Sequence, residues 1–155
     1  MSDAAVATQI LPVRNEGELF QALAIREVVF IEEQHVPEGL ERDEEDASAF
    51  HVLAVRGGHA VGTARLVMSA PVPPGETGRW AQIGRMAVLQ QARGSGVGSL
   101  LLQTLETEAR RREVAGILLR AQLTALEFYK KHGYLPVGPV FKEVGMDHLE
   151  MHKRF

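Results

Sequence analysis

The sequence Arg93-Gly-Ser-Gly-Val-Gly98 follows an apolar stretch, Trp80–Val88, and precedes a segment with helical periodicity. Three glycines within five positions let the backbone turn sharply, and they let a ligand approach without obstruction by Cβ atoms. Backbone N–H groups at the start of a helix form a natural site for phosphate. An ordinary glycine-rich turn between a strand and a helix has the same composition, so both interpretations stay open on this stretch alone.

Two common phosphate-binding motifs do not fit this turn. A P-loop requires Gly-Lys-Ser/Thr, and no lysine lies between Gly94 and Ser99. A dinucleotide fingerprint requires a third glycine and an acidic residue about 20 positions later, at the end of the next strand. Ser99 stands in place of that glycine, and Glu113 precedes the next expected strand.

The segments around the turn predict an α/β or α+β fold, with helices covering a sheet. Capping boxes are expected at Asn15/Glu18, for a helix to about Phe30, and at Thr124/Glu127, for a helix ending at Gly133. The longest helix follows the glycine turn and runs to about residue 112. Strands are expected at 8–13, 51–55, 60–68, 80–88, 117–119, 134–144 and 148–153, with hairpin turns at Gly57-Gly58 and Gly145.

Composition and charge narrow the function classes. The chain has 155 residues, 45% hydrophobic and 24% charged, which suits one domain over residues 1–155. The absence of cysteine excludes disulfides, thiolate metal sites and cysteine nucleophiles. A formal charge of −3 gives no cationic field for nucleic acid. No apolar run approaches the roughly 20 residues of a membrane helix.

Several features that the sequence lacks bear on where the protein is located and what it binds. Residues 1–7 are small and polar, so we expect them to be frayed and to contain no signal peptide. The lack of cysteine is compatible with a cytoplasmic protein. Arg110–Arg112 complements the negative end of a helix dipole and does not indicate a nucleic-acid patch. No regular metal-binding motif is present, and we expect no metal.

At this point the sequence resembles the GNAT superfamily of N-acetyltransferases. The coenzyme A motif of that superfamily, Arg/Gln-x-x-Gly-x-Gly/Ala, is matched by Arg93, Gly96 and Gly98. The segment Ala125–Tyr134 resembles its later signature, a helix with Phe-Tyr followed by Gly and an aromatic residue. The ElaA-like branch is indicated by Val29–Gln34, Gly62–Arg65, Ala121-Gln122 and the spacing of Glu41, Asp43 and Asp46.

The resemblance implies a mixed, twisted sheet of six or seven strands flanked by about four helices. The sheet should split between the strand ending at Val88 and the strand at Ile117, and acetyl-CoA should enter that cleft. The pantetheine arm, an extended amide chain, would pair with the edge of the strand at 86–88. The implied cofactor-binding residues are Met86, Ala87, Val88, Arg93, Gly94, Ser95, Gly96, Val97, Gly98, Ser99 and Phe128.

The implied reaction is direct acetyl transfer to a primary amine, without an acetyl-enzyme. Tyr129 stands where the family commonly places the acid that protonates the departing thiolate, and the alternative is a core aromatic. An N–H at Ala87 or Val88 would stabilise the oxyanion. Glu33 is our candidate base, with His51 and His148 as alternatives. The simpler interpretation is a solvated carboxylate for Glu33 and a structural histidine for His51 and His148.

Other questions stay open from the sequence. The acidic run at 41–46 could attract a cationic amine or form a solvated loop, and Arg65 and Arg85 could meet an anionic ligand or pair with that run. A non-catalytic acyl-CoA-binding sensor or interaction domain is an alternative function, and another phosphorylated ligand is a third. The acceptor is a small-molecule or peptide amine of undetermined identity, and a homodimer is open because relatives often dimerise.

Overall fold

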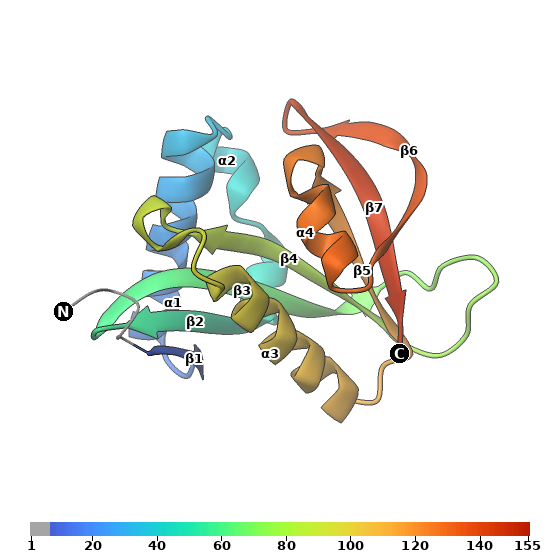
Figure 1. The fold of residues 1–155 in the computed structure, drawn as a ribbon, viewed down its shortest axis with the longest axis horizontal. Coiled ribbons are helices and arrows are strands. Elements are labelled where there is room, and N and C mark those ends of the chain that lie inside the picture. Colours follow the sequence, from blue (N-terminus) through green and yellow to red (C-terminus); the bar gives the residue numbers. More distant parts are fainter. Residues whose placement is uncertain (1–6) are drawn as a thin grey trace.

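In the computed structural model, which describes residues 7–155, seven strands form one mixed sheet in the order β1-β2-β3-β4-β5-β7-β6 (Figure 1). All neighbouring strands are antiparallel except β4 and β5, which are parallel. The expected fraying and absence of a leader at residues 1–7 fall, apart from Ala7, outside the described residues. The strands are β1 (Thr8–Pro12), β2 (Phe50–Arg56), β3 (His59–Ala70), β4 (Trp80–Val88), β5 (Gly116–Gln122), β6 (Leu135–Glu143) and β7 (Met146–Arg154).

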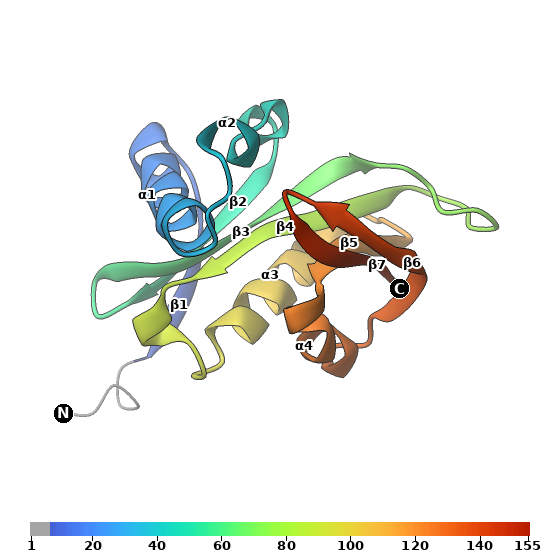
Figure 2. The same cartoon turned by 90° about the horizontal axis from the view of Figure 1, so that it is seen from above.

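Helices cover both faces of the sheet. Figure 2 shows α1 and α2 on one face and α3 and α4 on the other. No helix of the described part of the chain is both long and apolar enough to cross a membrane. The α-helices are α1 (Glu16–Arg26), α2 (Glu38–Glu41), α3 (Val97–Arg111) and α4 (Leu126–Lys131).

Helix α3 packs on the sheet through the four-residue repeat that its sequence shows. Val97, Leu101, Leu105 and Ala109 are all at most 1% exposed, and they belong to the main core cluster together with side chains of β2 to β5. A repeat of this spacing places its members on one face of a helix. The burial of that face fixes the start of α3, and with it the preceding glycine turn, against the sheet.

Helix α1 begins as predicted and then continues further than expected. The Asn15 side chain accepts a hydrogen bond from the Glu18 N–H at 2.8 Å, as an N-cap should. The Glu18 carboxylate accepts from the Arg14 N–H, one residue earlier than in a capping box. After Arg26 the chain continues as a π-helical segment over Glu27–Glu33, so the helical rod ends three residues beyond the expected Phe30.

One local expectation was wrong, and one of the two open alternatives for the acidic run needs revision. The capping box at Thr124 and Glu127 does not form, because a 3-10 turn occupies Leu123–Ala125 and α4 begins after Ala125 without a side-chain cap. The acidic run is not a plain loop, because it contains the end of α2 and a 3-10 turn at Glu44–Ala47. Gly133 does follow α4 with φ +91, the left-handed conformation expected of a residue after a helix C-cap.

The split between β4 and β5 is where the site lies. These strands pair only from Trp80–Gln82 to Gly116–Leu118 and then diverge (Figure 1). Beyond Gln82, β4 remains paired with β3 on its other side, so one edge of the strand is left without a partner strand. Arg85 interrupts this stretch with φ +51 at an irregularity in the β3–β4 register. The predicted cleft is confirmed.

Candidate functional site

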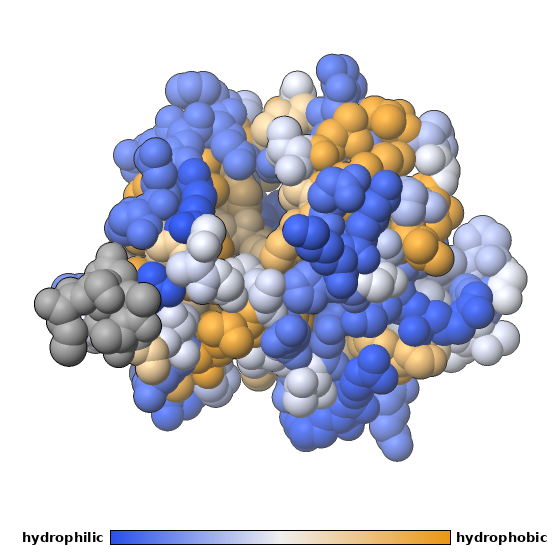
Figure 3. All heavy atoms as spheres, in the orientation of Figure 1, coloured by the Kyte–Doolittle hydropathy of each residue, from blue (hydrophilic) through white to orange (hydrophobic). Residues whose placement is uncertain are grey.

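A cavity of about 470 Å³ occupies the place where β4 and β5 diverge. One wall comes from the π-helical segment and α2, and the opposite wall comes from α4 and the β6–β7 hairpin. In the space-filling view, the surface is hollowed between these two sides, with hydrophobic residues on its walls (Figure 3). The residues used below that line it are Phe30, Val36, Leu40, Glu41, Asp43, Glu45, Arg65, Arg85, Met86, Arg120, Gln122, Tyr129, Glu143, Val144, Met146 and His148.

The glycine turn has the backbone that its sequence predicts. Gly94 and Gly96 have φ of +76 and +88, and a Cβ built on either would meet no atom within 4 Å. The first helix hydrogen bond onto the turn runs from the Leu100 N–H to the Gly96 carbonyl. The N–H groups before Leu100 therefore lie in the helix turn that lacks internal acceptors. This open space, bordered by backbone donors, fits a phosphate group.

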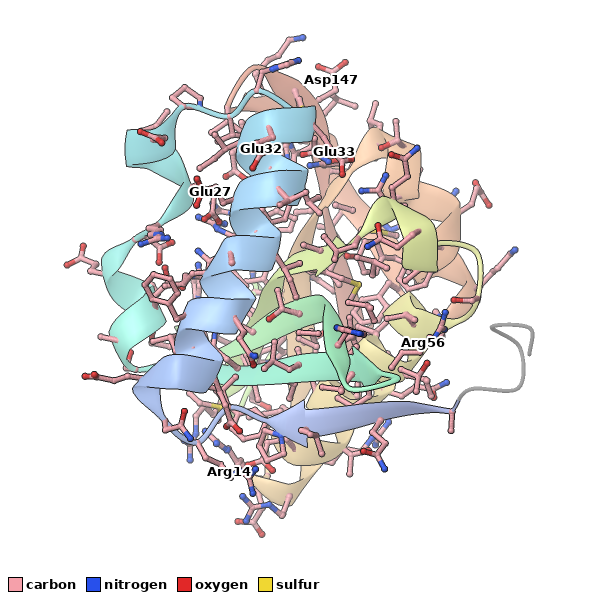
Figure 4. All side chains as sticks on the ribbon, turned by 90° about the vertical axis from the view of Figure 1, so that its left-hand side faces the viewer. Arg14, Glu27, Glu32, Glu33, Arg56 and Asp147 are labelled. Carbon is pink, nitrogen blue, oxygen red and sulfur yellow. The ribbon has the colours of Figure 1, made fainter. Side chains whose placement is uncertain are left out.

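Side chains hold the turn in place from both ends. Arg93 donates through Nε to the Val88 carbonyl at 2.8 Å and through Nη2 to Glu33 Oε2 at 2.7 Å. Ser95 donates to the Ala92 carbonyl at 2.6 Å. Arg56 in turn donates to Ser95 Oγ at 2.8 Å. Figure 4 shows Glu33 at the end of the π-helical segment and Arg56 at the end of β2.

The far side of the turn faces α4. Ser99, in the first turn of α3, has its hydroxyl 2.9 Å from His132 Nε2. A Cβ on Gly98 would lie 3.3 Å from the Phe128 ring and 3.9 Å from Met86 Sδ. The structure thus brings the predicted residues of β4, the turn and α4 together along the free edge of β4, and Met86 of this edge also lines the cavity. We call this stretch of edge, between the turn and the cavity, the passage.

Tyr129 lies in the cavity wall beside this passage. Its hydroxyl donates to Met86 Sδ at 3.9 Å, a weak partner. Its ring meets Phe128 edge-on at 5.0 Å between centroids, and both rings pack on the main core. Desolvation by burial raises the pKa of Tyr129 to about 12. The tyrosine therefore keeps its proton at neutral pH and can donate a hydrogen bond into the cavity.

The three base candidates lie in different places. Glu33 is absent from the residues that line the cavity and is bound to Arg93. His51 lies under the acidic segment with Nε2 2.9 Å from the Asp46 carbonyl, and desolvation lowers its pKa. His148 is 4% exposed and does line the cavity, with Nε2 3.8 Å from Glu143 Oε2.

Three of the five carboxylates in the acidic run, those of Glu41, Asp43 and Asp46, do not face a substrate freely, because three arginines bind them. Arg26 binds Glu41 at 2.8 Å and Asp46 at 2.7 Å. Arg65 binds Asp43 at 2.6 Å and Asp46 at 2.7 Å. Arg85 donates to the Glu41 carbonyl and to Asp43. Of the two open readings for Arg65 and Arg85, the structure shows pairing with the acidic run.

We call these six side chains the arginine–carboxylate network; they are Arg26, Arg65, Arg85, Glu41, Asp43 and Asp46. Hydrogen bonds from Arg65 lower the pKa of Asp43. Desolvation alone would raise the pKa of Asp46, but the hydrogen bonds and charge of Arg26 outweigh it and hold that pKa well below its usual range. Both carboxylates therefore stay ionised and keep the wall formed by α2 attached to the sheet.

These shifts predict acid sensitivity. A carboxyl group whose pKa is lower in the folded state stabilises the fold above its unfolded pKa of about 3.9, and this contribution is lost as pH falls toward the folded value. We expect the free energy of unfolding to decrease below about pH 4. Urea unfolding of the wild type and of Asp46→Asn between pH 3 and 6 measures how the free energy of unfolding depends on pH. The same pH slope in both proteins would contradict the assignment to Asp46.

The sequence analysis left open that Arg65 and Arg85 pair with the acidic run, but it did not predict the place of Arg26 in the network or two further side-chain pairs. Arg26 lies on the apolar repeat of α1, and an arginine at such a position was the available signal that a buried carboxylate partner exists. The Arg120–Glu143 pair joins β5 to β6, and the Ser99–His132 pair joins α3 to α4. No local pattern marks either pair, since each depends on how distant elements meet.

Comparisons with known proteins agree with this geometry. Residues 13–155 match the family model described as an acetyltransferase (GNAT) domain. Uncharacterized N-acetyltransferase YjcF of Bacillus subtilis is 35% identical over 141 residues, which cover 90% of this chain and 95% of that protein. Protein ElaA of Escherichia coli is 30% identical over 141 residues, covering 87% and 86% of the two chains.

Solved structures give the same answer. The crystal structure of Escherichia coli ElaA has a TM-score of 0.78 at 29% identity, covering 96% of this chain and 99% of the other. An acyl-CoA N-acyltransferase from Pseudomonas aeruginosa has a TM-score of 0.76 at 26% identity, covering 95% and 99%. The seven-stranded sheet with four helices is the fold that these relatives share. The chain belongs to the GNAT family of acetyltransferases.

Proposed function

We propose that this acetyltransferase moves the acetyl group of acetyl-CoA to a primary amine by direct attack within a ternary complex. The observation that carries the proposal is the sequence of three features along β4. The glycine turn, with open space at Gly94 and Gly96, follows the C-terminal end of β4, the edge of β4 beyond Gln82 has no partner strand, and Met86 on β4 lines the cavity together with Tyr129. A relative 26% identical to this chain is described as an acyl-CoA N-acyltransferase, which supports the choice of cosubstrate.

Different groups of the chain would bind different parts of acetyl-CoA. The backbone N–H groups of residues 94–99, at the positive end of the 15-residue helix α3, would bind the diphosphate. The unpaired edge of β4 at Met86–Val88 would accept the pantetheine amides as an added strand. Phe128, which lies against Gly98, would cover the passage. Arg93 already holds the C-terminal end of β4 to the turn.

Transfer requires that a C–N bond forms while a C–S bond breaks. Of the two predicted donors, Ala87 stands opposite Thr63 at a hydrogen-bonded position of the β3–β4 ladder, which leaves Val88 on the free edge. The Val88 N–H would stabilise the oxyanion that develops on the thioester carbonyl. Tyr129 would donate a hydrogen bond to the departing sulfur. Its pKa of about 12 exceeds the thiol value of roughly 8–9, so full proton transfer from Tyr129 is uphill by a few kcal/mol. Tyr129 therefore acts chiefly as a hydrogen-bond donor to the thiolate.

The Tyr129→Phe variant tests this function. We expect kcat for coenzyme A release over a panel of primary amines to fall about 100-fold, because the thiolate loses its donor, while the Kd of acetyl-CoA stays within about twofold of the wild-type value. Thiol release and calorimetry measure the two quantities. Unchanged kcat would contradict the role of Tyr129. Tight acetyl-CoA binding without release on any amine would favour a non-catalytic sensor.

A further inference from the structure

We infer that the acceptor is a primary amine with an apolar body, and that His148 is the base that deprotonates it while Glu143 positions the pair. This inference rests on the proposed function and names the substrate class of the same cavity. It is carried by the corner that His148 and Glu143 form in the wall and by two exposed apolar side chains that also line the cavity.

The hydrogen bond of His148 leaves the lone pair on its Nε2 atom. Its Nδ1 lies 2.9 Å from the Met146 carbonyl, which can only accept, so Nδ1 carries the proton and donates. The neutral ring then has its acceptor at Nε2, and this atom faces Glu143 Oε2 at 3.8 Å. Phe141 stacks on the ring at 5.8 Å between centroids and an angle of 25°. The imidazole is thus held in one tautomer and one orientation.

Glu143 is the carboxylate available to a cation at this corner. Arg120 binds its Oε1 at 3.1 Å, which leaves Oε2 directed toward His148. Glu41, Asp43 and Glu45 also line the cavity, from the wall that carries α2. Glu41 and Asp43 are bound to the arginine–carboxylate network, and Glu45 lies outside that network and away from the hairpin that carries His148. The charged groups around His148 are therefore Glu143 and, behind it, Arg120. The adjacent Asp147 is bound to Lys142 at 2.9 Å.

Apolar side chains line both walls of the cavity beside its polar groups. Leu40 on α2 is 58% exposed, and Val144 in the β6–β7 turn is 36% exposed, and they come from the two opposite walls. Phe30, Val36 and Met146 line the same cavity, whose polar and charged lining residues include Arg85 and Gln122. An alkylamine would place its ammonium group at the corner of His148 and Glu143 and its chain against these apolar side chains.

The proton balance is complete with these groups. The ammonium gives one proton to His148 Nε2, and its nitrogen, now neutral, forms the C–N bond with the thioester carbon. The C–S bond breaks, and the second nitrogen proton passes to the thiolate sulfur through water. The imidazolium finally releases its proton to solvent. The overall change is ammonium plus acetyl thioester to acetamide, thiol and one proton.

Amine binding is tested without turnover by histidine ring NMR, with n-hexylamine as probe and hexan-1-ol as its neutral counterpart, with and without coenzyme A. His148→Gln assigns the His148 signals. We expect hexylamine to move those signals and Glu143→Gln to weaken its binding at least about tenfold, since a hydrogen bond to a charged group is lost. Unmoved His148 signals, an equal response to hexanol, or unchanged affinity in Glu143→Gln would overturn the inference.

The base is tested by the pH profile of hexylamine acetylation. His148→Gln should lower kcat/KM about 100-fold at pH 7, and the deficit should shrink toward pH 10, where the amine, with a pKa of about 10.4, loses its proton unaided. His152→Gln is the matched control, because His152 pairs with Glu150 at 2.7 Å on the same strand outside the cavity. A deficit independent of pH, or an equal one in the control, would refute the role. Failure of acetyl-CoA binding in the wild type would instead contradict the proposed function.

Discussion

The Arg26→Met variant is expected to lose about 3–5 kcal/mol of its free energy of unfolding, because it leaves buried carboxylates without their partner. Arg26 is 1% exposed, and its guanidinium binds one carboxylate oxygen and the carbonyl of Glu41 and both carboxylate oxygens of Asp46. Methionine fills much of the same volume but donates no hydrogen bond. For a domain of this length, such a loss lowers Tm by roughly 10 °C.

Urea unfolding and calorimetry at pH 7 measure the effect, and Arg14→Met is the matched control. Arg14 also lies beside α1 and pairs with a carboxylate, Glu18 at 3.3 Å, but its side chain is 68% exposed. An exposed pair of this kind contributes at most about 1 kcal/mol. If the two variants lost similar stability, the arginine–carboxylate network would not anchor the segment that carries α2.

The same variant links stability to the site. Arg26 holds Glu41 and Asp46 from α1, while Arg65 and Arg85 hold Asp43 from β3 and β4. The wall of the cavity that carries Leu40 is therefore attached to the sheet largely by charged hydrogen bonds. Each is stronger than a neutral hydrogen bond, and burial protects it from salt. Arg26, which does not line the cavity, thereby helps to hold this wall in position.

Local sequence signals predicted most of the elements around the cleft. The bounds of β4, 80–88, match, because an apolar run is enclosed by a proline- and glycine-rich loop and a glycine turn. Helix α3 and the hairpin at Gly57-Gly58 follow from equally local patterns. Each of these segments carries its own periodicity and its own turn residues. Its local conformational preference therefore agrees with the conformation that it adopts in the fold.

The remaining features depend on contacts between distant residues. Asp46 is 20 positions from Arg26 and 19 from Arg65, and no spacing rule connects them. Thr124 does not cap α4 as expected, because the chain enters α4 through a 3-10 turn. Glu33 lies at the end of a π-helical segment, a conformation that periodicity does not indicate. Its binding to Arg93 places it beside the glycine turn, and its role as base stays a prediction.

The Gly96→Val variant is expected to weaken acetyl-CoA binding roughly 10- to 100-fold, the equivalent of losing one hydrogen bond to a charged group. A Cβ at this position meets no protein atom within 4 Å, so the side chain would occupy the space that the diphosphate needs. Valine also strains the backbone at φ +88, at roughly 1–2 kcal/mol or more. That strain must be separated from the loss of binding.

Gly75→Val separates them, because Gly75 has φ +82, has equally open surroundings, and lies in the loop between β3 and β4, away from the turn. Both variants should lose similar stability by urea unfolding, yet only Gly96→Val should lose acetyl-CoA affinity by calorimetry. A native Kd in a folded Gly96→Val protein would mean that the diphosphate binds elsewhere. Equal weakening in both variants would mean that backbone strain, and not occupation of the turn, reduces binding.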